Sequence, residues 1–364
     1  MSLYLQSNKK FCRLNQAKIS LFNSESISRL LFCGDIFLNT HNKHNPFTQI
    51  LQEFEKSLVC INLETSLRKG REKKKNVSLS VTEKALDYLP ESLAFVSIVN
   101  NHSADAAEPG RLAELLRKRG KQVIGPSNPS VLRACVNGQM LDFMSAYLAL
   151  PRGAYYGGTV GKRLEELLRS SDADRRIVNL HWGYEHTEVP APFQRDLAHR
   201  LIDVGANIIV GHHPHVAQGW EIYHGAPIFY SLGNFNFWQF DIETTEKNRW
   251  GYMVAYDIIN AKAEPIPYRI NENYQPIPST TDEYNILMAR LSELSEKVRL
   301  SINRGRWFES CYKNWFNREF QTWKRHSIDA KSPQVILKFL VWLILPLQLI
   351  YYVYTIKKYL RRLF

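Results

Sequence analysis

The chain has few cysteines, and none of them lie close together. Five cysteines are spread over 364 residues without a CxxC motif, which argues against a disulfide framework and suits a reducing compartment. Residues 1–20 lack both an apolar core and a small-residue cleavage site. We therefore expect no signal peptide and no N-terminal anchor. Internal repeats are lacking as well, so we expect one large domain, or one domain with appendages.

Acidic residues are scarce relative to basic ones. The chain holds 47 Lys and Arg against 35 Asp and Glu, which gives a net charge of +12. Such an excess favours an anionic partner, such as membrane lipid, an acidic polymer, a phosphorylated substrate or nucleic acid. The alternative is a solvated basic surface, because part of the excess lies in the run 68–75. A hydrophobic content of 45% indicates a globular protein rather than a disordered one.

Short apolar runs alternate with amphipathic segments through the first 260 residues. Nine runs are predicted as strands: 29–34, 57–62, 94–99, 121–125, 141–150, 176–180, 207–211, 227–232 and 251–259. Segments with apolar residues at helical spacing, such as 110–120 and 193–205, lie between several of them. This alternation predicts βαβ units and a largely parallel, layered α/β sheet.

The composition changes after about residue 280. Residues 282–305 are predicted as a helix, and residues 306–326 interleave aromatic and basic side chains. That mixture is found in proteins that bind nucleic acid, but next to an apolar tail an interfacial membrane helix explains it better. We therefore expect membrane lipid, and not nucleic acid, to contact residues 306–364.

The apolar tail itself runs uncharged over residues 339–356. At a rise of about 1.5 Å per residue, this run spans roughly 27 Å, just short of the ~30 Å hydrocarbon core of a bilayer. Pro346 removes a helix hydrogen bond, so a kinked or re-entrant segment competes with a straight span, and a buried core helix is the third possibility. We expect residues 335–364 to associate with the membrane and the α/β domain to stay on its cytoplasmic side.

Polar residues of metal-ligand type follow five of the predicted strands. They are Asp35, then Asn62 and Glu64, then Asn100, Asn101, His102 and Asp105, then His181 and Glu185, and finally His212, His213 and His215. In α/β sheets, functional side chains gather at the carboxyl ends of strands. Carboxylate, imidazole and amide donors in this number predict a site for two divalent cations, with Mn, Fe or Zn as candidates.

Six motifs in order carry a family resemblance: GD, NLE, NNHSAD, HWGYE, GHHPHVAQ and YSLGNF. With them the chain resembles the CapA, or PGA_cap, capsule-synthesis family over roughly residues 29–260. The resemblance implies a calcineurin-like metallophosphoesterase fold, which is a layered β-sandwich flanked by helices. We divide the chain into an N-terminal extension (1–28), the CapA-like domain (29–275), a helical aromatic-basic region (276–331) and the hydrophobic tail (335–364).

The resemblance also implies roles for single residues. Asp35 and His215 would bind the first metal, Glu64 would bridge both metals, and Asn101, His181 and His213 would bind the second. His102 would be the general acid or the oxyanion donor, with Asp105 as its orienting partner. Glu185, Asn234, Asn62 and Ser231 would bind substrate. His212 is predicted to be a spare residue that packs or faces solvent. Metallophosphoesterases usually begin with Asp-x-His, whereas Phe37 stands here two residues after Asp35.

Two functions follow from the resemblance. The first is a metal-dependent hydrolase of a phosphoester or related bond, which acts in the synthesis of a capsular polysaccharide, poly-γ-glutamate or another anionic cell-surface polymer. The second is a non-catalytic, membrane-docked accessory protein that binds the polymer or scaffolds its synthesis. In both cases we expect the polymer or its precursor, and a polymer-synthesis complex, as partners. The missing histidine after Asp35 favours the second function.

Overall fold

The structure is a computed structural model that describes residues 28–38, 45–68, 78–148, 159–237, 245–307 and 310–311. The chain divides into two compact units, Met1–Tyr312 and Lys313–Phe364. All described residues belong to the first unit. The predicted N-terminal extension up to residue 27, nearly all of the aromatic-basic stretch and the whole hydrophobic tail lie outside the described residues.

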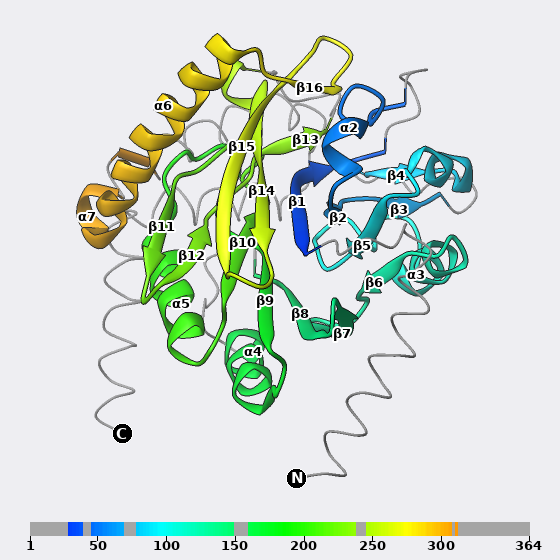
Figure 1. Ribbon diagram of the computed structural model, residues 1–364, viewed down its shortest axis with the longest axis horizontal. Helices are drawn as coiled ribbons and strands as arrows, with labels where there is room; N and C mark the ends of the chain where they lie inside the picture. The colour runs from blue at the N-terminus through cyan, green and yellow to red at the C-terminus, as the bar shows by residue number, and fades with distance from the viewer. Residues whose placement is uncertain are drawn as a thin grey trace, which may run out of the picture. The chain divides into compact units, whose positions relative to one another are not determined.

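The first sheet has eight strands, which come from residues 29–124 and from residues 234–278 (Figure 1). Its parallel part consists of β1 (Arg29–Ile36), β2 (Leu58–Leu63), β5 (Leu93–Ser97) and β6 (Gln122–Ile124), with β13 (Asn234–Asn236) pairing to the end of β1. On the other side of β1, the antiparallel strands β14 (Trp250–Asp257), β15 (Lys262–Ile270) and β16 (Pro276–Pro278) complete it.

The second sheet has six strands in the order β11-β12-β10-β9-β8-β7. The central strands β12 (Ala226–Phe229), β10 (Ile208–His212), β9 (Arg175–His181) and β8 (Gln139–Tyr147) are parallel. The edge strands β11 (Trp220–Tyr223) and β7 (Ser130–Val136) are antiparallel to their neighbours. A separate two-stranded ladder joins β3 (Ser66–Leu67) and β4 (Ser80–Val81).

Apolar side chains from both sheets form one core between them. Phe95 of β5 stacks on Phe143 of β8 with ring centroids 4.2 Å apart, and both are buried. On the outer faces, α3 (Pro109–Lys118) packs on the first sheet, and α4 (Thr159–Ser170) and α5 (Pro192–Asp203) pack on the second. The short helix α2 (Leu51–Phe54) adds Phe54 to the core of the first sheet. The predicted α/β layering is therefore confirmed.

Helix α6 (Thr281–Lys297) closes the edge of the core between the sheets. Thr280 and Glu283 form a reciprocal capping box at its start, which satisfies backbone N–H groups that a helix end leaves unpaired. Short helical turns surround these elements: η1 (Glu83–Tyr88), η2 (Glu246–Asn248), η3 (Val298–Ile302) and α7 (Arg304–Trp307).

Two expectations need correction. The predicted membrane location is wrong on the structural finding: in the described part of the chain, no helix is long and apolar enough to cross a bilayer. The longest, α6, has 17 residues and an acidic first turn, whereas a span needs about 20 mainly apolar residues.

The second expectation concerns the cysteines, which the sequence predicts to be unpaired. Cys33, Cys60 and Cys311 are free, as predicted. Cys135, in contrast, is disulfide-bonded.

Candidate metal centre

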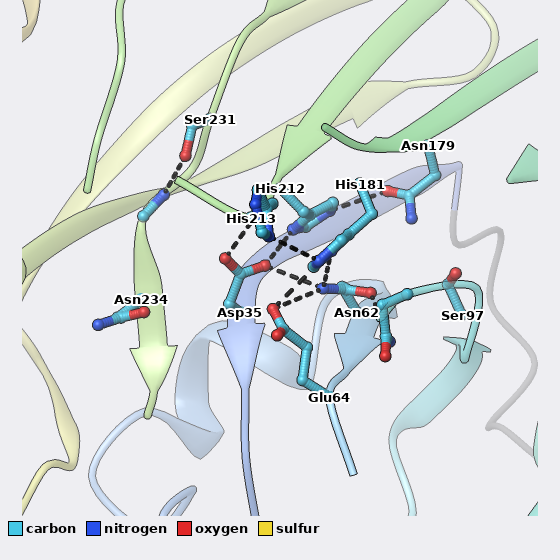
Figure 2. A network of polar contacts seen from close by, with 12 residues as sticks. Asp35, Asn62, Glu64, Ser97, Asn179, His181, His212, His213, Ser231 and Asn234 are labelled. Carbon is cyan, nitrogen blue, oxygen red and sulfur yellow. Dashed lines mark hydrogen bonds and ion pairs between the residues drawn. The ribbon is translucent and has the colours of Figure 1, made fainter. Parts of the chain in front are cut away.

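The ends of four parallel strands meet where the two sheets face each other (Figure 2). Strands β1 and β2 place Asp35 and Glu64 there, while β9 and β10 place His181 and His212. Strand β13 lies beside β1 with Asn234 in register with Asp35. Segments that are far apart in sequence therefore deliver oxygen and nitrogen donors to one buried location, as the five strand-end motifs predict.

Asp35 is the most extensively bonded residue of this centre. Its side chain is fully buried, and Oδ1 accepts from Asn62 Nδ2 and His212 Nδ1, each at 2.9 Å. Oδ2 accepts from the backbone N–H of His213 at 3.0 Å. Burial acts to raise the pKa of Asp35, but the hydrogen bond and charge of His212, with the charge of His215, outweigh it and lower the pKa to about 2. Asp35 is thus held as a carboxylate.

Glu64 lies one strand away and is equally buried, but it has few partners. Oε1 accepts from Asn62 Nδ2 at 3.2 Å, whereas Oε2 has no hydrogen-bond partner among the residues that the structure describes. Burial, reinforced by the negative charge of Asp35, raises the pKa of Glu64 well above its usual range. A buried carboxylate oxygen without a donor is costly, and a bound cation would remove that cost.

The histidines contact one another as well as the carboxylates. His181 Nε2 lies 2.7 Å from Asn101 Oδ1 and 3.1 Å from His213 Nδ1. His215 Nδ1 lies 3.0 Å from Asn234 Oδ1, and its Nε2 lies 4.0 Å from Glu64 Oε2. Burial lowers the pKa of His181 well below its usual value and that of His213 to about 4, so both imidazoles are neutral at pH 7. Neutral imidazoles are the form that binds metals.

Two groups of donor atoms in the described residues could hold a cation. Asp35, Glu64 and His181 form the first group, and Glu185, His213 and His215 form the second; within each group the atoms lie within 4.8 Å of one another. Together with the unpartnered Oε2 of Glu64, these mixed oxygen and nitrogen donors fit a borderline divalent ion such as Zn, Mn or Fe. The grouping places Glu185, predicted to bind substrate, among possible ligands.

His102 and Asp105 form a pair beside the centre. His102 Nδ1 lies 2.7 Å from Asp105 Oδ2, which also accepts from the backbone N–H of Leu79 at 3.0 Å. A carboxylate only accepts, so Nδ1 donates, and Nε2 is directed toward Glu64, with 3.9 Å between Nε2 and Oε2. The structure thus brings together the two residues predicted for proton transfer and places them next to the carboxylates.

The remaining predicted residues have internal partners. Ser231 Oγ donates to the carbonyl of Val216 at 2.8 Å and accepts from the N–H of Gly233, so its hydroxyl holds the loop before β13. His212, predicted as a spare residue, is 2% exposed and joins Asp35 to Asn179, since its Nε2 lies 2.9 Å from Asn179 Oδ1. A polar Asn179 inside the apolar run of β9 was the sequence feature that could have indicated this partner.

Sequence reasoning also missed His186, which follows the HWGYE motif. Its side chain is 5% exposed, its φ is 60°, and its Nδ1 lies 3.3 Å from Asn248 Nδ2. His213 and His215 also have positive φ values, 96° and 57°. Non-glycine residues adopt this region at a cost, and such strain concentrates at functional sites. The position of His186 directly after Glu185 was the only indication in the sequence.

Comparison with known proteins points to one family. The family model described as "Bacterial capsule synthesis protein PGA_cap" matches residues 142–239. The "Capsule biosynthesis protein CapA" of Bacillus anthracis is 28% identical over 263 residues, which cover 63% of this chain and 63% of the relative. The chain therefore spans less than two thirds of that relative's length. The "PGA biosynthesis protein CapA" of Bacillus subtilis is 55% identical over 65 residues, covering 18% of this chain and 17% of the relative. These matches confirm the predicted resemblance.

Solved structures give a weaker likeness. A phosphatase from Mycoplasma pneumoniae aligns with 68% of this chain and 95% of its own, at 15% identity and a TM-score of 0.46. A hypothetical protein from Thermus thermophilus aligns with 66% of this chain and 99% of its own, at 18% identity and a TM-score of 0.45. These scores are too low to establish a common fold, so the calcineurin-like assignment stays a prediction.

Proposed function

Because the chain is a relative of the PGA_cap capsule-synthesis proteins, we propose that it is a metal-dependent hydrolase that acts on a phosphoester or related bond during synthesis of an anionic cell-surface polymer. The observation that carries this proposal is the convergence of buried carboxylates and neutral histidines on the His102–Asp105 pair. The buried Glu64 Oε2, which has no hydrogen-bond partner among the described residues, supports it, because a bound cation would offset the cost of burying that oxygen.

The donor groups would hold the cation, with Glu64 between them. When bound, a divalent cation supplies Lewis-acid activation of the reacting groups and stabilises developing negative charge. Asp35 stays ionised through its hydrogen bonds and fixes the loop of His213 by accepting its backbone N–H. Asn234 orients His215 through Nδ1, which leaves Nε2 as the nitrogen available to a ligand.

His102 would transfer the proton to the leaving group. Asp105 accepts a hydrogen bond from Nδ1–H of His102 and is itself fixed by the N–H of Leu79. The imidazole is thereby held with Nε2 toward the centre, where it can protonate a departing oxygen. The basic net charge of +12 supports an anionic substrate, since long-range attraction raises the local concentration of such a ligand.

The test is metal content together with Mn²⁺-supplemented turnover of a generic phosphodiester. We expect His102→Gln to lower kcat by about 10²–10⁴-fold with unchanged metal content, the usual range for loss of a general acid. His213→Ala should lose metal and activity together. The exposed His224 provides the matched control, His224→Gln, which should change neither. Protein that holds no metal, with His213→Ala unchanged in every respect, would refute the proposal.

A second candidate is a non-catalytic accessory protein that binds the polymer in the same place. One observation favours it: Phe37 stands where metallophosphoesterases usually carry a histidine, so one imidazole donor is missing beside Asp35. A genetic comparison separates the two candidates. If a His102→Ala strain still makes polymer while a strain lacking the whole gene does not, the protein acts as a scaffold.

A further inference from the structure

The amide of Asn62 lies among the donor atoms of the first group. Its Nδ2 is 2.9 Å from Asp35 Oδ1, 3.2 Å from Glu64 Oε1 and 3.2 Å from His181 Nδ1. These are the three residues that form the first candidate cation group. Figure 2 shows the amide nitrogen at the meeting point of the contacts from Asp35, Glu64 and His181. An N–H₂ group therefore occupies the place that a cation bound to the same three residues would need.

The orientation of this amide is fixed by its other end. Asn62 Oδ1 accepts from Asn100 Nδ2 at 3.3 Å, and that same Nδ2 donates to the carbonyl of Leu63 at 2.9 Å. Asn100 thus presents a donor, so Asn62 must present its oxygen to Asn100 and its nitrogen to the carboxylates. Asn62 is 0% exposed and belongs to β2, which pairs on both sides within the sheet. The amide has little room to turn away.

Donors of the protein also fill most acceptor positions of Asp35. A carboxylate has about four acceptor positions. Two on Oδ1 are taken by Asn62 and His212, and one on Oδ2 by the N–H of His213, with His215 Nδ1 a further neighbour at 3.4 Å from Oδ2. Coordination of a cation by Asp35 would therefore break hydrogen bonds that already compensate its burial.

The second group, Glu185, His213 and His215, is different in this respect. The amide that contacts it, that of Asn234, presents its oxygen to Nδ1 of His215 and so leaves the Nε2 edge of that ring open. The unpartnered Oε2 of the fully buried Glu64 lies 4.0 Å from this Nε2. Two carboxylates and two imidazoles then surround one position, which is an ordinary donor set for one Zn or Mn ion.

We infer that the Asn62 amide fills the first group and that the chain binds one divalent cation, at the second group, instead of two. This inference deepens the proposed function and rests on its metal centre. It also accounts for Phe37: where an internal amide replaces the first cation, no histidine is needed after Asp35. Asn62, predicted to contact substrate, is instead a residue that sets the metal stoichiometry.

The test is the number of Mn²⁺ ions bound by the metal-stripped full chain, measured by isothermal titration calorimetry and by elemental analysis after dialysis. We expect one equivalent for the wild type. Asn62→Ala removes the amide and should admit a second equivalent, and Asn62→Ser, which retains a smaller polar group, serves if the alanine variant does not fold. Asn179→Ala is the matched control, because it removes a nearby amide whose contact with the histidines is to His212; one equivalent should remain.

The outcomes separate the inference from the proposed function. Two equivalents in the wild type would overturn the inference and leave the proposed function intact. One equivalent in both the wild type and the two Asn62 variants would show that the amide does not exclude the second ion, and would equally overturn it. No bound metal in any variant would instead refute the metal-dependent function itself.

Discussion

Asp35 and Glu64 lie at the ends of neighbouring strands and are both completely buried, yet their surroundings differ. Asp35 accepts hydrogen bonds from Asn62, His212 and the backbone of His213. Glu64 accepts a hydrogen bond on Oε1 from Asn62, and in the described part of the chain its Oε2 has no hydrogen-bond partner. The pKa of Asp35 falls to about 2, whereas that of Glu64 rises well above its usual range.

The comparison teaches that the number of donors, and not the depth of burial, decides what a buried carboxylate does. Burial acts to raise the pKa of both residues, and only at Asp35 do hydrogen-bond donors and histidine charges outweigh it. We therefore regard Asp35 as the structural anchor of the centre and Glu64 as the residue kept open for a ligand. Substitutions of the two should have opposite consequences.

The largest expected effect is on stability, at Asp35. Asp35→Ala leaves His212 Nδ1, Asn62 Nδ2 and the N–H of His213 without their acceptor in a buried place. Removing one partner of a buried ionic network costs about 3–5 kcal/mol, so the free energy of unfolding of the metal-free protein should fall by that amount. Urea denaturation followed by circular dichroism measures it.

Asp87→Ala is the control for this experiment. Asp87 is paired with Arg119 at 2.8 Å, but its side chain is 65% exposed. Exposed ion pairs contribute about 0–1 kcal/mol, so this variant should stay close to the wild type. Equal losses for the two variants would contradict the anchor role of Asp35.

The second effect is on metal affinity, at Glu64. Glu64→Gln keeps the shape and replaces an acid whose raised pKa already favours the neutral form, so the metal-free protein should lose no stability. Mn²⁺ affinity should fall by about 100-fold or more, since loss of mere outer-shell partners already costs about 10–100-fold. Calorimetric titration and thermal unfolding of the same samples test both halves of this prediction.

Glu221→Gln is the control for Glu64→Gln. Glu221 accepts hydrogen bonds from Tyr230 and Arg195 and contacts His199, so the same substitution there should cost about 1–3 kcal/mol of stability and leave Mn²⁺ affinity unchanged. If Glu64→Gln behaved like Glu221→Gln, with lower stability and unchanged affinity, Glu64 would be an ordinary structural acid.

The inner strands of the fold could be predicted from sequence because they are continuous apolar runs. Each of the nine predicted strands corresponds to an observed one. The sequence prediction missed the edge strands β7 and β11, because their partly exposed residues interrupt the apolar pattern. It also missed β15, in which Pro265 and Pro267 interrupt that pattern. Helix α4 was missed as well, although it packs three buried residues on the second sheet.

At the centre, the strand-end rule found the residues but not their connections. Asp35, Glu64, His181, His213 and His215 do converge, as their positions after strands predict. Whether His212 faces solvent or Asp35 depends on how the second sheet packs against the first. The apolar pattern of a single sequence does not give that packing. The same holds for Asn62, whose amide orientation follows from Asn100 beyond the end of a third strand.

Lys121 is a buried basic residue outside the centre. Lys121 precedes β6, at the opposite end of the parallel strands from the centre, and is 6% exposed. Its Nζ donates to the carbonyls of Pro90 and Glu91 at 2.6 and 3.3 Å. Burial lowers the pKa of Lys121 to about 8, although the charge of Glu91 opposes the shift. Like Glu64, Lys121 is pushed toward its neutral form, but it belongs to neither of the donor groups found among the described residues.

The smallest expected effect is the pH dependence that Lys121 imposes on stability. Between pH of about 8 and 10.5 the folded chain binds fewer protons at Lys121 than the unfolded chain, so the free energy of unfolding should rise with pH over this window. Below pH 8, Lys121 is protonated in both the folded and the unfolded chain, so the full cost of burying its charge lowers the free energy of unfolding. Lys121→Met removes the titration. The wild type should therefore gain about 2–2.5 kcal/mol relative to this variant between neutral pH and about pH 10, at ~1.4 kcal/mol per pKa unit for a pKa that falls from 10.5 to about 8. Urea denaturation at the two pH values measures the gain, and parallel behaviour of wild type and variant would show that Lys121 is solvated in the folded state.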